Sequence, residues 1–100
     1  MQKARLTIDE IKARTVPIAQ RHGVASMFLF GSYARNEASP TSDVDICVEK
    51  GKIQGLIQYY SFVHDLERAL QCHVDVITTG IEDQDFLNEI KKNMVLLYEQ

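Results

Sequence analysis

The spacing of apolar residues changes several times along this 100-residue chain. Apolar residues recur at helical spacing between residues 8 and 18. Thr7 and Glu10 have the spacing of a capping box, and Gly23 is a typical helix stop. These signals predict a first helix over residues 7–22. Pro17 lies inside it, so we expect a kink or a division into two helices.

Three later segments have the pattern of β-strands. Residues 27–30 are wholly apolar, which is typical of a buried strand. Residues 43–48 and 73–78 alternate between apolar and polar side chains, so each is predicted to be a strand with one buried face. Residues 94–98 are predicted to form a final short strand.

The remaining apolar residues predict further helices between these strands. A brief helix is expected at residues 33–35 and a last one from residue 83, with a polar loop over 37–42 and a turn over 50–52. A longer helix is predicted from about residue 55 to residue 71. Its apolar stripe is expected to consist of Leu56, Tyr59, Val63, Leu66 and Leu70.

Helices and strands therefore alternate along most of the chain. Such an order predicts an α/β (α+β) fold with helices packed on a small β-sheet. A chain of 100 residues has room for one hydrophobic core, so residues 1–100 are predicted to form a single domain.

Composition narrows the class of protein. No apolar run reaches the ~18–20 residues that span a bilayer, and the two cysteines do not indicate a disulfide framework. A cytoplasmic protein without membrane contact is expected. The formal net charge of −3 disfavours direct binding of nucleic acid, whose phosphates usually attract a basic surface.

The candidate functional residues lie near the ends of the predicted strands or on their polar faces. Gly31 and Ser32 lie between a strand and a helix, where backbone N–H groups favour a phosphate. Asp43 and Asp45 share one face of the next strand and together suit a hard cation such as Mg²⁺. Asp75 supplies a further oxygen ligand if its strand is a neighbour of theirs.

These residues match a known signature. Gly31-Ser32, ten intervening residues and Asp43-Val44-Asp45 resemble the signature of the DNA polymerase β-type nucleotidyltransferase superfamily. Residues 30–35 (Phe-Gly-Ser-Tyr-Ala-Arg) and 42–46 (Ser-Asp-Val-Asp-Ile) are similar to its minimal nucleotidyltransferase (MNT) branch. The resemblance covers most of the chain and implies a polymerase β-like core with a small mixed sheet. Asn36 stands where glycine is common, and asparagine tolerates the left-handed conformation that this turn needs.

The resemblance implies a role for each matched residue. Gly31 and Ser32 would bind the triphosphate of ATP, the substrate. Two Mg²⁺ ions are expected on the aspartates. In this family the aspartate of the later strand, matched here by Asp75, is also drawn as the general base. The three implied metal ligands and catalytic residues are Asp43, Asp45 and Asp75. Arg35 is assigned to the nucleotide site, although it also fits a surface charge. Ser42 is assigned there as well, or it orients the loop before Asp43.

The resemblance also implies a partner. MNT proteins of this kind are antitoxins that pair with a HEPN-type ribonuclease toxin in a hetero-oligomer, and they transfer AMP to a tyrosine hydroxyl of the toxin. Alternatively, the chain is a non-catalytic antitoxin or adaptor that binds nucleotide and blocks its partner sterically. Transfer to a small-molecule hydroxyl is disfavoured because no substrate domain is present. Zinc at Cys72-His73-x-Asp75 is also disfavoured, since a structural zinc site needs four ligands.

Overall fold

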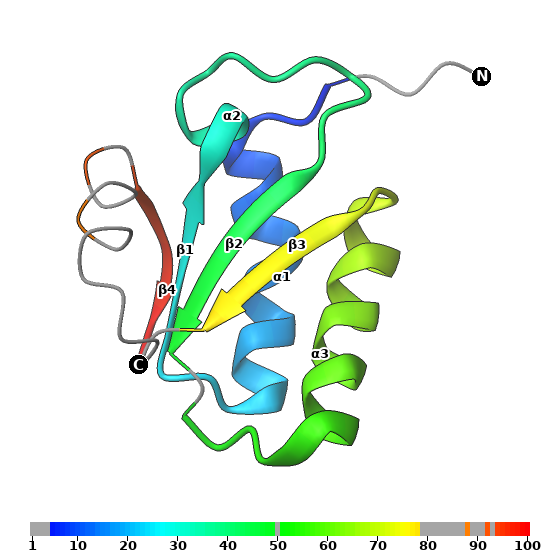
Figure 1. Cartoon of the computed structure of the whole chain (residues 1–100), viewed down its shortest axis with the longest axis vertical. Coiled ribbons are helices and arrows are strands. Elements are labelled where there is room, and N and C mark those ends of the chain that lie inside the picture. The colour runs from blue at the N-terminus through cyan, green and yellow to red at the C-terminus, as the bar shows by residue number, and fades with distance from the viewer. Residues whose placement is uncertain (1–4, 50, 79–87, 89–91, 93) are drawn as a thin grey trace.

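The structure is a computed structural model, and it describes residues 5–49, 51–78, 88, 92 and 94–100. The helix predicted from residue 83 lies outside these residues, apart from isolated positions. The described helices and strands follow the predicted order (Figure 1). They are α1 (Ile8–His22), β1 (Ser26–Phe30), α2 (Gly31–Ala34), β2 (Val44–Glu49), α3 (Gly55–Leu70), β3 (Val74–Thr78) and β4 (Val95–Glu99).

The four strands form one mixed sheet in the order β3-β2-β1-β4. β1 is antiparallel to both β2 and β4, whereas β2 and β3 are parallel. A parallel pair needs a crossover connection, and α3 supplies it. The predicted fold class is therefore confirmed. Because β2 and β3 run in the same direction, their first residues lie at the same end of the sheet.

The hydrophobic core lies between the sheet and the two long helices, which pack side by side (Figure 1). The predicted inner face of β2 is confirmed, since Val44, Ile46 and Val48 are all fully buried. The other large, fully buried side chains include Ile11, Met27, Leu29, Phe62, Leu66 and Leu70. Among the described helices, none combines the length and the apolar character that crossing a membrane requires.

α1 is one helix, so of the two outcomes expected at Pro17, a kink or a division, the division is wrong. Both hydrogen bonds of the capping box between Thr7 and Glu10 are present, and Gly23 ends the helix with φ 73°. The exposed proline costs one backbone hydrogen bond, but the buried face of the helix packs against the core on either side of it. Tertiary packing therefore outweighs the local preference for a break.

The apolar stripe of α3 is rotated relative to the prediction. Leu66 and Leu70 are buried as expected, but Phe62 is the third fully buried residue of the helix. Leu56 was predicted to be buried and is instead 70% exposed. The three buried residues recur every four positions and define the centre of the packed face, whereas Leu56 lies in the first turn on one flank of that face.

Candidate active site

The parallel pairing of β2 and β3 brings two of the predicted aspartates together. Asp45 and Asp75 occupy directly paired positions in the two strands. Paired residues of neighbouring strands point to the same face, so both carboxylates lie on the face opposite the buried Val44 and Ile46. The sequence made the role of Asp75 conditional on this adjacency, and the condition is met.

The third aspartate lies just before β2. The backbone N–H of Val44 donates to the carbonyl of His73 over 3.1 Å, which aligns the residues that precede the two strands. Asp43 and His73 therefore lie beside each other. One possible ligand atom from each of Asp43, His73 and Asp75 lies within 4.8 Å of the other two. All three side chains are exposed, so the cluster is open to a ligand from solvent.

Gly31 forms the floor beneath Asp45. Its φ is 74°, in the left-handed region that L side chains rarely adopt. A Cβ added at this position would overlap the carboxylate of Asp45. The glycine of the motif is therefore required for two separate reasons, the backbone conformation and the space above its Cα. This contact links the first half of the motif directly to the second.

The carboxylates of the site repel one another. The pKa of Asp45 is raised, first by burial and then by the charges of Asp75 and Asp43. Arg35 acts in the opposite direction and lowers that pKa. A cation at this place would stabilise the ionised carboxylates. The three aspartates offer carboxylate oxygens, which are the ligands that Mg²⁺ prefers.

The other predicted residues of the first half of the motif belong to α2 and the turn that follows it. Ser32 follows Gly31 in α2, and its carbonyl accepts the N–H of Glu37 over 2.8 Å. Arg35 forms an ion pair with Glu37 at 3.3 Å, although its charge still acts on Asp45. The predicted left-handed turn is confirmed at Asn36, where φ is 60°.

Ser42 shapes the loop that leads to Asp43. Its hydroxyl oxygen accepts the backbone N–H of Ser39 over 2.8 Å and lies 3.2 Å from the Ser39 hydroxyl. The backbone N–H of Ser42 in turn donates to the Ser39 carbonyl over 3.0 Å. These contacts agree with the predicted role in orienting the loop. They direct the hydroxyl toward Ser39.

Two residues beside the aspartates were not among the predicted site residues, although His73 was considered with Cys72 and Asp75 as a zinc ligand and disfavoured. His73 Nε2 lies 2.8 Å from Asp75 Oδ1, and His73 Nδ1 lies 3.1 Å from Glu67 Oε2. The pKa of His73 is raised, chiefly by its hydrogen bond to Asp75. His73 was detectable, because two positions along a strand share one face. Glu67 was not detectable from the sequence, because only the packing of α3 on β3 brings it beside His73.

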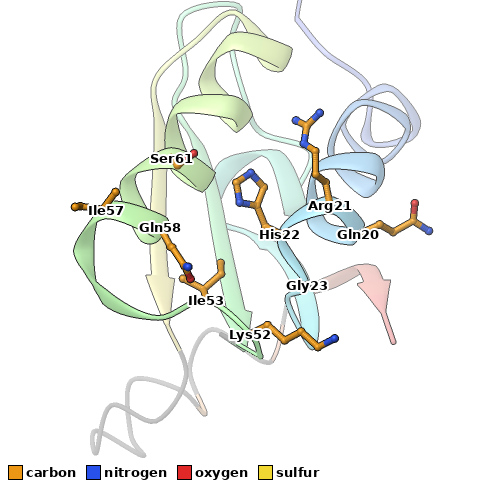
Figure 2. Close-up of a pocket in the computed structure, with 9 residues that line it drawn as sticks. All are labelled: Gln20, Arg21, His22, Gly23, Lys52, Ile53, Ile57, Gln58 and Ser61. Atoms are coloured by element: carbon orange, nitrogen blue, oxygen red, sulfur yellow. The ribbon is translucent and has the colours of Figure 1, made fainter.

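A separate hollow of about 530 Å³ lies at the opposite end of the sheet, where α1 ends and α3 begins (Figure 2). The residues that line it include Arg21, His22, Lys52 and Gln58. It contains no member of the predicted site. The carboxylate cluster thus lies on an open edge of the sheet and not in this hollow.

Comparison with known proteins agrees with this arrangement. Residues 14–100 match the model of a family described as polymerase beta, nucleotidyltransferase. The chain therefore belongs to the polymerase β nucleotidyltransferase family, and it is a nucleotidyltransferase of the minimal branch. The suggested resemblance is confirmed.

Relatives narrow the class further. A Methanocaldococcus jannaschii protein, provisionally named a protein adenylyltransferase, is 45% identical over 73 residues, which are 73% of this chain and 78% of the relative. The protein adenylyltransferase MntA of Thermococcus cleftensis is 37% identical over 78 residues, covering 74% of this chain and 79% of its own length.

Solved structures share the fold at low sequence identity. A chain of a toxin–antitoxin complex with AMP-PNP superposes with a TM-score of 0.75 at 19% identity, covering 89% of this chain and 73% of that one. Another match is a chain from a complex of a tri-AMPylated Shewanella oneidensis HEPN toxin with an MNT antitoxin. It superposes with a TM-score of 0.69 at 17% identity, covering 92% of this chain and 72% of that one.

Proposed function

We propose that this chain is a Mg²⁺-dependent protein adenylyltransferase and the antitoxin of a HEPN-type toxin. It would transfer AMP from ATP to a tyrosine hydroxyl of that partner, within a hetero-oligomer in the cytoplasm, and residues 1–100 would act as one minimal nucleotidyltransferase domain. The observation that carries the proposal is that Asp43, Asp45 and Asp75 come together at the start of two strands that meet only in the folded chain, with Asp45 packed against Gly31.

The residues present fit a divalent cation. Three carboxylates lie together, and the pKa of Asp45 is raised first by burial and then by the charges of Asp75 and Asp43. The ions, when bound, would neutralise the charge that develops on the phosphates and orient the reacting groups. Asp43 and Asp45, from the start of β2, would hold the ions on one side of the nucleotide, and Asp75 from β3 would complete the set.

The chain's own groups would position the reaction. Gly31 leaves room for the Asp45 carboxylate to lie against the backbone, and the Ser32 hydroxyl beside it would donate to a phosphate oxygen. Arg35 lies near enough to Asp45 to influence its charge, so it suits a contact with the nucleotide's phosphates. Such positioning and charge neutralisation account for most of the catalysis of phosphoryl transfer.

The proposed AMP transfer forms one bond and breaks one bond. The tyrosine oxygen forms a bond to the α-phosphorus of ATP while the bond from that phosphorus to the bridging oxygen breaks, and pyrophosphate leaves. Asp75 is the group assigned to accept the proton of the hydroxyl, because its carboxylate is 54% exposed at the site and reaches solvent beside Asp43. Product AMP-tyrosine remains on the partner.

The known proteins support the partner as well as the reaction. Two relatives that this chain matches over most of their length are named protein adenylyltransferases, one of them provisionally. The structural neighbours include toxin–antitoxin complexes, one with AMP-PNP and one with an AMPylated HEPN toxin. The mildly acidic chain suits a protein acceptor better than a nucleic acid.

The test is to co-express the chain with the product of the neighbouring gene and to measure the intact mass of that partner. We expect an AMP-sized increment, which peptide mapping should place on a tyrosine. Asp43→Asn and Asp45→Asn should each abolish the increment, because each removes a charged ligand while keeping the shape of the side chain. Asp65→Asn, far from the site on α3, is the matched control and should leave the increment in place.

An unmodified partner that remains tightly bound and inhibited, both with the unsubstituted chain and with Asp43→Asn, would refute catalysis. It would establish the non-catalytic alternative, in which the chain neutralises its partner sterically.

A further inference from the structure

His73 is held in a defined orientation beside the aspartates. Glu67 Oε2 lies 3.1 Å from His73 Nδ1 and also accepts the backbone N–H of Val74 over 3.1 Å. The glutamate is thus fixed by the start of β3, and it fixes the imidazole ring in turn. The other ring nitrogen, Nε2, consequently faces the carboxylate of Asp75 at 2.8 Å.

This arrangement has the form of a metal-binding histidine with its outer carboxylate. A ligating imidazole commonly gives its second N–H to a carboxylate, which sets the tautomer and directs the free nitrogen to the ion. Without an ion, Nε2 and the Asp75 carboxylate share a hydrogen bond over 2.8 Å. With Nδ1–H directed at Glu67, a cation that displaces the proton of this bond would take up both the Nε2 lone pair and the carboxylate oxygen.

We propose that Asp43, His73 and Asp75 form a mixed nitrogen–oxygen metal site, with His73 Nε2 as a direct ligand, that prefers a first-row transition ion such as Mn²⁺ over Mg²⁺. Their ligand atoms already lie within 4.8 Å of one another. The inference rests on the proposed function, because Asp43 and Asp75 are metal ligands in both. It adds a nitrogen donor and therefore a different choice of ion.

The donor chemistry determines the preference. Imidazole binds transition ions well, whereas Mg²⁺ favours oxygen ligands and keeps several waters. Three protein ligands on an exposed edge leave coordination positions for phosphate oxygens, which suits an exchangeable ion in contact with substrate. Asp45 stands beside Asp75 without belonging to the three-residue group, so an all-oxygen position remains next to the mixed one.

The test uses Mn²⁺ alone, without nucleotide, on the full chain. Pulsed electron paramagnetic resonance should detect coupling of the bound Mn²⁺ to a ¹⁴N nucleus of imidazole. His73→Ala should abolish this coupling and raise the Mn²⁺ dissociation constant at least ~10-fold, while the Mg²⁺ dissociation constant, measured by competition, should change by less than about 2-fold. His64→Ala, at an exposed histidine of α3, is the matched control and should keep both the coupling and the affinity.

Glu67→Gln separates the ligand from its support. It should retain the ¹⁴N coupling but raise the Mn²⁺ dissociation constant by roughly 10-fold, because the imidazole remains and only its outer carboxylate changes. Absence of ¹⁴N coupling in the unsubstituted chain at saturating Mn²⁺ would overturn the proposal, and so would parallel losses of Mn²⁺ and Mg²⁺ affinity in His73→Ala. If the coupling is present but no AMP transfer is found, the proposed function fails and the mixed site stands.

Discussion

The two ends of the sheet carry opposite kinds of surface. Where β2 and β3 begin, four acidic side chains gather, namely Asp43, Asp45, Glu67 and Asp75. Where α1 ends and α3 begins, Arg21, His22 and Lys52 surround a hollow, and none of the described residues that line it is acidic (Figure 2). The net charge of −3 for the whole chain therefore describes neither region.

The ends also differ in how their charges are satisfied. Near the hollow, Asp65 lies 2.8 Å from His22 and 3.2 Å from Arg21, and its pKa is lowered, mainly by the bond to His22. At the other end, burial and neighbouring carboxylates raise the pKa of Asp45. Charges at the hollow thus stabilise the fold, whereas the crowded carboxylates at the strand ends oppose ionisation of Asp45. Perturbed pKa values of this kind are typical of functional sites, which supports the function proposed for the strand ends.

The largest expected effect on stability comes from alanine at two glycines, one at each end. Gly31 and Gly55 have almost the same φ, 74° and 73°, but only Gly31 has a neighbour where a Cβ would go. Gly31→Ala should lower the free energy of unfolding by about 2–4 kcal/mol, from backbone strain plus overlap with Asp45. Gly55→Ala should cost only the strain, about 1 kcal/mol. Urea denaturation of both variants measures the difference.

A second substitution checks the cause of that difference. In a Gly31→Ala/Asp45→Ala double variant the overlap is absent, so most of the additional cost should be recovered. Equal losses for Gly31→Ala and Gly55→Ala would mean that the Asp45 carboxylate moves aside at no cost, and the described contact would not constrain the site.

Asp65→Asn tests the paired charges at the hollow. We expect a loss of about 1 kcal/mol at neutral pH, because the amide keeps the shape but not the charge that His22 and Arg21 contact. A lowered pKa contributes stability that is complete above the ordinary carboxyl pKa of about 4 and is lost as the pH falls through the folded-state value. Thermal melts between pH 3 and 7 should therefore converge at acid pH. A difference in melting temperature between the two proteins that stays constant from pH 7 to pH 3 would contradict the charge pairing.

The smallest expected effect has the opposite sign. In the absence of divalent ions, Asp45→Asn should leave stability unchanged or raise it by less than about 1 kcal/mol, since it removes a repelled carboxylate. A raised pKa makes ionisation destabilising, so the gain should be present above the folded-state pKa and absent below the ordinary value of about 4. Melts in chelator across that range measure it, and a marked loss of stability near pH 7 would contradict the repulsion.

Much of this end of the molecule was predictable from sequence because its signals are local. Strand alternation placed Asp43 and Asp45 on one face, and asparagine at residue 36 indicated the left-handed turn that the structure shows there. The buried residues of β2 were likewise correct. The motif residues are close in sequence, so periodicity and turn chemistry determined them.

The failures concern contacts between distant elements. The rotation of α3 that buries Phe62 and exposes Leu56 depends on how the helix meets the sheet. The same packing brings Glu67 to His73, which no pattern in the sequence announces. The continuity of α1 through Pro17 has a similar origin, since burial on both sides of the proline outweighs its local cost.

β3 is an edge strand of the described sheet, and it carries Asp75 on a segment of only five residues. In place of a further strand, α3 binds its backbone, because Tyr59 donates to the Val76 carbonyl over 2.9 Å and Glu67 accepts the Val74 N–H. Local opening of this edge would carry Asp75 and His73 away from Asp45 while β1, β2 and α1 stayed folded. Hydrogen exchange at the amides of β3 therefore measures how readily this edge opens and the assembled site comes apart.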